Sequence, residues 1–151
     1  KGGQIKQKES RTMRAKFAGA AALIMALQAG AVVAEGNIAA NPTDLPELML
    51  TGDLAMSETE YQLETGKYYR ISISSDGQEE FAWFAPELFR NSWINQVVVN
   101  DLEVKAADIY SLEFDAAGTF VLTFVPLRPG QYDFYVDGYA DRGMLGHFIV
   151  N

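Results

Sequence analysis

Residues 129–150 read PGQYDFYVDGYADRGMLGHFIV, and this stretch gives the clearest indication of the fold. Within it, residues 131–136 and 146–150 are short runs in which apolar side chains alternate with other residues. That alternation is typical of strands with one buried face. The nine residues between them include turn formers, so the stretch predicts two strands separated by a loop.

Similar runs continue upstream at spacings of about 8–12 residues, each bounded by turn residues. They are residues 48–51, 61–63, 67–75, 81–84, 94–99, 109–114 and 119–125. Residues 86–91 (PELFRN) predict one helical turn with proline at its first position. A chain of about eight short strands predicts an all-β sandwich or barrel.

Composition excludes several classes of protein. The 151 residues contain no cysteine and one histidine, and the formal charge is −8. Without cysteine there is no disulfide framework, zinc finger, iron–sulfur cluster or thiol nucleophile. The negative charge argues against nucleic acid as a partner.

The charge is divided unevenly along the chain. Residues 1–34 carry six bases and one acid, whereas residues 35–151 carry six bases and nineteen acids. Between the two regions lies an apolar run, residues 17–34, whose only polar side chain is Gln28. A basic stretch, an apolar run and small residues such as Val32 and Ala34 are the layout of an export signal. Positive charge stays on the cytoplasmic side, so the acidic part is expected to be exported.

Three interpretations of residues 17–34 remain open: a cleaved signal peptide, an uncleaved membrane anchor of the minimum spanning length, or a buried soluble helix. The sequence then divides into a basic segment (1–16), the signal or anchor helix (17–34), a linker (35–46) and an all-β domain (47–151). We expect the domain on the periplasmic side of a bacterial inner membrane, or free in the periplasm after cleavage.

The motifs of the last third resemble those of cupredoxins, over roughly residues 48–151. They are Gly118-x-Phe120, Pro129-Gly130-x-Tyr132-x-Phe134-x-Val136 and Gly143-Met144-x-Gly146-x-Phe148-x-Val150. In that family the two strands flank a loop with three copper ligands. The resemblance implies a Greek-key β-sandwich behind the N-terminal hydrophobic helix.

The same resemblance shows what the chain lacks. Val136 stands where the family has its cysteine, residues 139–141 hold no histidine, and Glu79 and Glu80 occupy the first histidine region. Of the ligands, only the methionine remains, as Met144. A blue-copper site needs a thiolate and two imidazoles. We therefore expect no blue-copper centre and no cofactor.

An alternative metal site follows from the same resemblance, which would gather acids near the methionine. Its candidate ligands for copper or iron are Glu79, Glu80, Asp137, Asp141, Met144 and His147. The opposing interpretation is that the acids coat a solvated loop, Met144 fills the core and His147 is a packed or hydrogen-bonded strand residue.

Residues 81–93 (FAWFAPELFRNSW) concentrate aromatic side chains and one arginine. Such residues are enriched in binding hot spots, so one interpretation is a docking surface. Its candidates are Phe84, Leu88, Phe89, Arg90 and Trp93. The other interpretation is a connection whose aromatics plug one end of the core. Tyr110, Tyr132, Tyr135 and Tyr139 extend either one.

No catalytic motif stands out, since Gly-x-Ser-x-Gly and phosphate-binding glycine loops are absent from the sequence. We expect a non-catalytic, membrane-tethered domain that serves as an accessory subunit of a membrane protein complex. An electron-transfer complex is expected from family analogy alone. The alternative is a soluble periplasmic copper- or iron-handling protein.

Overall fold

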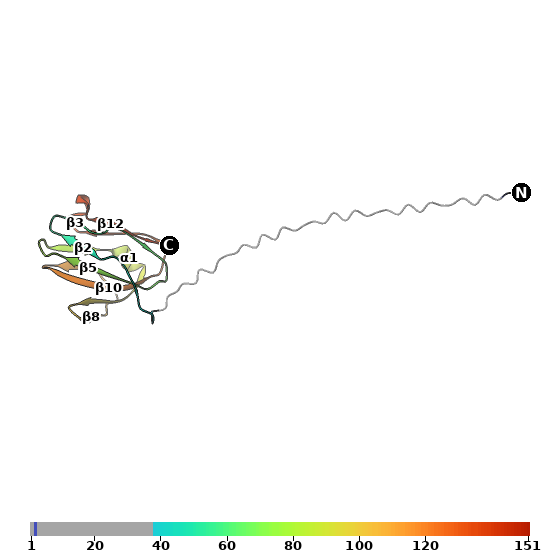
Figure 1. The fold of residues 1–151 in the computed structure, drawn as a ribbon, viewed down its shortest axis with the longest axis horizontal. Coiled ribbons are helices and arrows are strands. Elements are labelled where there is room, and N and C mark those ends of the chain that lie inside the picture. Colours follow the sequence, from blue (N-terminus) through green and yellow to red (C-terminus); the bar gives the residue numbers. More distant parts are fainter. Residues whose placement is uncertain (1, 3–37) are drawn as a thin grey trace. The chain divides into compact units, whose positions relative to one another are not determined.

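The computed structural model describes Gly2 and residues 38–151 (Figure 1). The basic segment, the apolar run 17–34 and residues 35–37 of the expected linker lie outside the described residues, and the expectations for them stay predictions. In the described part, no helix is long and apolar enough to cross a membrane.

The first sheet contains seven strands. Its order is β3 (Ala55–Met56), β2 (Leu48–Thr51), β5 (Tyr69–Ser75), β10 (Gly118–Pro126), β7 (Ser92–Val99) and β8 (Leu102–Val104). The seventh strand, β1 (Thr43–Asp44), pairs in parallel with β5, and so does β2 further along. Strands β2, β5, β10 and β8 can be followed in Figure 1.

The second sheet contains five strands. Its order is β4 (Glu60–Leu63), β12 (Leu145–Val150), β11 (Gly130–Val136), β6 (Phe81–Phe84) and β9 (Leu112–Phe114). The chain crosses repeatedly between the sheets, and the short helix α1 (Pro86–Arg90) connects β6 of the second sheet to β7 of the first. A 3-10 turn, η1 (Ala140–Arg142), lies between β11 and β12. The architecture is thus a Greek-key sandwich, as the sequence predicted.

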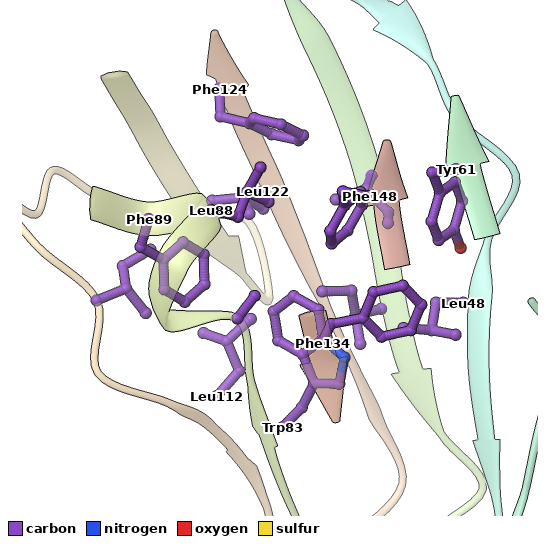
Figure 2. Close-up of a cluster of buried hydrophobic side chains, with 14 of the residues drawn as sticks. Leu48, Tyr61, Trp83, Leu88, Phe89, Leu112, Leu122, Phe124, Phe134 and Phe148 are labelled. Atoms are coloured by element: carbon purple, nitrogen blue, oxygen red, sulfur yellow. The ribbon is translucent and has the colours of Figure 1, made fainter. Parts of the chain in front are cut away.

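Buried side chains from both sheets form one core cluster. At its centre a series of neighbouring rings runs through Phe89, Trp83, Phe134, Phe148 and Tyr61 (Figure 2). These rings come from α1 and from four strands of the second sheet, so one aromatic series packs across that sheet. Burial of the Tyr61 ring raises the pKa of its hydroxyl, which donates a hydrogen bond to the Pro46 carbonyl.

The structure corrects the expected elements at the edges of the sheets. The described residues form twelve strands, and those that the pattern missed are β1, β3 and β8. Each of the three has only two or three residues, too few to show an alternation. The expected linker therefore ends early, because Thr43–Asp44 already pairs with β5. The expected run 109–114 is a strand only from Leu112 onwards, whereas the helical turn after Pro86 is confirmed.

The turn after β5 depends on Asp76 and Gly77. The Asp76 carboxylate accepts hydrogen bonds from the backbone N–H groups of Gln78 and Gly52, each at 3.0 Å. These two bonds lower the pKa of Asp76 from its usual 3.8. Gly77 has a φ of +73°, and a Cβ there would lie 2.2 Å from the backbone nitrogen of Ala117. The sharp turn thus requires glycine.

Asp76→Asn is expected to lower the melting temperature at neutral pH, because the amide cannot accept both backbone bonds as strongly as the carboxylate. The pKa of Asp76 is depressed in the folded state. Its contribution to the stability of the fold is therefore present above the unfolded pKa and is lost as pH falls through the lower folded pKa. Thermal unfolding at several pH values checks this. The difference in melting temperature between the two proteins should narrow at pH values below the usual aspartate pKa of 3.8. A difference that stays constant down to acid pH would contradict the prediction.

Candidate functional site

The aromatic segment 81–93 is divided between the core and the surface. Alternation along β6 buries Phe81 and Trp83 and leaves Phe84 half-exposed on the outer face. In α1, Leu88 and Phe89 are buried, at 0% and 4% exposure, because the helix turns them toward the ring series. Neither can therefore belong to a docking surface, and for them the core interpretation holds.

Trp93 lies apart from Phe84. It is in β7 of the first sheet, next to the inward-facing Ile94, and it is 40% exposed. Phe84 lies on the outer face of the second sheet. Because the chain changes sheets through α1, the two side chains lie on the outer faces of different sheets, and the expected five-residue surface does not form.

Phe84 instead joins a set of side chains that the structure brings together across the second sheet. Its ring stacks on that of Tyr135, its cross-strand neighbour, with centroids 5.5 Å apart. Tyr135 is also paired across β11 and β12 with Leu145, which is 39% exposed. Tyr110 contacts the Phe84 ring edge-on at 5.3 Å and is 82% exposed. We call Tyr110, Phe84, Tyr135 and Leu145 the outer row.

A shallow cleft of about 150 Å³ opens beside the outer row. Its lining consists of Phe84, Pro86, Arg90, Asp108, Ile109, Tyr110 and Tyr135. Arg90 is exposed and forms an ion pair with Glu87 of the same helix. Of the five expected docking residues, Phe84 and Arg90 thus line one site, together with two of the tyrosines that the sequence had offered as an extension.

The candidate metal ligands do not all meet at one place. Met144 is fully buried in the core. Glu80 and Asp137 line an open hollow of about 420 Å³. Glu79 lines an adjoining one together with Glu80, and Asp141 is in η1. Among residues 38–151, no group of three or more acidic or histidine side chains is arranged to hold a metal ion.

The resemblance would have placed His147 beside Met144, but His147 is on the outer face of its strand whereas Met144 is buried in the core. His147 lies in β12, where its cross-strand neighbours are Asp133 and Glu60. Its Nδ1 is 2.8 Å from an Asp133 carboxylate oxygen and 3.2 Å from the Gln131 amide. The residue therefore corresponds to a hydrogen-bonded strand histidine on the outer face of the sheet.

The sequence reasoning missed Leu145 as a surface residue. The signal was present, because Gly146, Phe148 and Val150 alternate as the buried face of β12 and Leu145 takes the opposite phase. Its partnership with Tyr135 depends on the register between β11 and β12, which sequence alone does not give.

Comparison with known proteins supports the fold and does not identify a family or a function. No family model matches the chain, and no curated protein matches it. Among solved structures, a multicopper oxidase aligns with a TM-score of 0.58 at 10% identity, over 74% of this chain and 45% of that one. A multicopper oxidase from Campylobacter jejuni aligns with a TM-score of 0.52 at 10% identity, over 74% and 30%. Auracyanin B aligns at 17% identity with a TM-score of 0.47, over 74% and 91%.

The chain thus spans less than half the length of the multicopper oxidases that it matches. At this identity the likeness concerns the fold alone. The described domain is a cupredoxin-like β-sandwich.

Proposed function

We propose that this chain is a non-catalytic, membrane-tethered accessory subunit of a membrane protein complex, with its cupredoxin-like domain on the periplasmic side and no blue-copper centre. An electron-transfer complex is the context that the resemblance favours. The observation that carries the proposal is the combination of a ligand region without the thiolate and imidazole donors of blue copper and the outer row on the second sheet.

The residues at the family's ligand positions lack the donors of a blue-copper centre. Val136, at the position of the family's cysteine, is an apolar side chain with 0% exposure, and Met144 is equally buried. Tyr139, in the region of the second histidine, packs edge-on against Phe81 with centroids 6.0 Å apart. A thioether alone is a weak ligand, and neither a thiolate nor an imidazole accompanies it.

Exposed aromatic side chains support a binding role. Tyrosine is one of the residues that contribute most energy at protein interfaces. Tyr110 keeps 82% of its surface exposed while its ring contacts that of Phe84 edge-on. A tyrosine side chain has few rotatable bonds, so it loses little side-chain entropy when a partner covers it.

The tether and the location rest on the sequence. The apolar run 17–34, with bases before it and acids after it, supports a single anchor that leaves the domain exported. An apolar helix on one subunit can pack laterally against the spans of a larger protein.

The proposal is tested by solubilising membranes of the producing cells in a mild detergent and separating the extract by size. We expect the chain to remain with the membranes during washing and to elute with a larger protein after extraction. Recovery of the chain in the soluble fraction as a free species, at or below its own 16.7 kDa, would contradict the proposal.

Metal titration gives a separate prediction. Isothermal titration of the purified chain with Cu(I), Cu(II) or Fe(II) should give no tight stoichiometric binding, because no three acidic or histidine side chains of the described residues are arranged around one point and Met144 is buried in the core. Tight binding of one ion per chain that is lost in Glu80→Gln and Met144→Leu would show that the copper- or iron-handling alternative is correct.

A further inference from the structure

The outer face of the second sheet has one sign of charge. Its five strands contain the carboxylates of Glu60, Asp133 and Glu113 and no lysine or arginine. His147 on this face is hydrogen-bonded to Asp133. The first sheet, by contrast, contains Arg70, which is paired with Asp44. The two faces of the sandwich therefore offer different surfaces to a partner.

Carboxylates flank the outer row on both sides. On one side of Tyr135, the next outward-facing residue of β11 is Asp133. Its cross-strand neighbour in β12 is His147, and the neighbour of His147 in β4 is Glu60. On the other side of the row, the next outward-facing residue of β6 is Ala82, which is paired with Glu113 of β9. The N–H of Asp137, just after β11, donates a hydrogen bond to the Ala82 carbonyl. The row is thus an apolar strip between two acidic borders.

The border near Ala82 continues into the hollow of about 420 Å³. Four carboxylates line it, those of Glu80, Glu113, Asp115 and Asp137. The two arginines near the row leave most of this charge in place. Arg90 is paired with Glu87, and Arg142, 5.5 Å from the ring centroid of Tyr139 beside the hollow, offsets only one of the four carboxylates.

We propose that the outer row is the docking surface for the partner subunit, and that the partner contributes an apolar segment flanked by lysine or arginine. This inference rests on the proposed function, since it identifies the surface through which the accessory subunit binds. Apolar side chains of the partner cover Tyr110, Phe84, Tyr135 and Leu145. Its basic side chains lie over the acidic borders, where complementary charge sets orientation and association rate.

Two other exposed apolar places provide controls. Leu127 is 57% exposed at the end of the first sheet, where its N–H bonds to the carbonyl of Asn91, just before β7. Leu102 is 70% exposed on the edge strand β8. Neither belongs to the second sheet with its acidic face, so charge complementarity distinguishes them from the outer row.

The test is photocross-linking of the full chain in membranes of the producing cells. Benzoylphenylalanine replaces Tyr110, Leu145, Leu102 or Leu127, one at a time, at positions exposed enough to tolerate it. We expect positions 110 and 145 to give the same adduct with another membrane-complex protein, at least about fivefold more than positions 102 and 127. Mass spectrometry of the adduct should identify a partner peptide that combines apolar residues with lysine or arginine.

A matched pair of charge reversals tests the acidic border. Glu113 and Glu103 are each the central residue of a three-residue edge strand, one in either sheet. Glu113→Lys should reduce cross-linking at position 110 by about threefold or more, whereas Glu103→Lys should leave it unchanged. Equal effects of the two reversals would overturn the role of the border.

The outcomes separate this inference from the proposed function. Adducts with a larger complex from positions 102 or 127, but not from 110 and 145, would overturn the docking surface and leave the accessory role standing. An adduct with a second copy of the chain, with lipid or with an acidic peptide would overturn the stated partner. No adduct from any position, together with a free chain in the extract, would overturn both.

Discussion

Trp83→Ala is expected to lower the free energy of unfolding by about 3–5 kcal/mol, the cost typical of removing a large buried ring. Trp83 has 0% exposure and lies between Phe89 and Phe134, with centroid distances of 6.0 Å to each. Its removal would interrupt the ring series that joins α1 to the second sheet (Figure 2). Chemical denaturation of the two proteins measures the difference.

Trp93→Ala is the matched control for this experiment. The same residue type is removed, but Trp93 is 40% exposed, so we expect a loss of about 1 kcal/mol or less. Trp83→Phe should also cost less, below about 2 kcal/mol, because phenylalanine keeps part of the packing and removes a buried N–H. That N–H has no hydrogen-bond partner among the described residues. Equal losses for Trp83→Ala and Trp93→Ala would contradict this description of the core.

Gly146→Ala is expected to destabilise the fold by about 3 kcal/mol, at the upper end of the range for overpacking. A Cβ at this position would lie 2.3 Å from the Phe134 ring and 2.6 Å from the carbonyl oxygen of Thr59. The ring belongs to the buried series, and the carbonyl accepts a hydrogen bond from the His147 N–H at 2.8 Å. Neither neighbour can move without disturbing the pairing of β12.

The control is Gly118→Ala, at the first residue of β10, where a Cβ would come no closer than 4.0 Å to another atom. We expect its melting temperature to stay close to that of the unchanged chain. If both alanine variants unfolded at the same temperature, the close approach of Gly146 to Phe134 and Thr59 would be wrong. Thermal unfolding followed by circular dichroism is sufficient for the comparison.

Much of the fold could be predicted from the sequence because its strands alternate clearly. In β5, Tyr69, Ile71 and Ile73 face the core in the phase that the pattern predicts. The edge strands could not be predicted in this way. Strand β8 has three exposed residues, so its sequence contains no buried face to recognise. Strand β1 has two exposed residues and is defined by its backbone pairing with β5 alone.

The candidate site was predicted less well, and for a physical reason. Residue types alone showed that residues 81–93 are rich in aromatic side chains, but not which of them face outward. Helix α1 turns Leu88 and Phe89 inward, and the crossing to the first sheet separates Trp93 from Phe84. The outer row depends on two registers. That of β6 with β11 joins Phe84 to Tyr135, far apart in the chain, and that of β11 with β12 joins Tyr135 to Leu145 across the intervening loop. Such registers are fixed by tertiary packing.

The most direct test of the central claim is native mass spectrometry of the chain recovered from its own membranes without denaturation. One spectrum reports both the partners and the metal content of the particle. We expect a particle that contains this chain together with at least one other subunit, in which the chain itself, once dissociated, has its polypeptide mass without bound copper or iron. Detection of the chain without any other subunit and with one metal ion bound would contradict the proposed function.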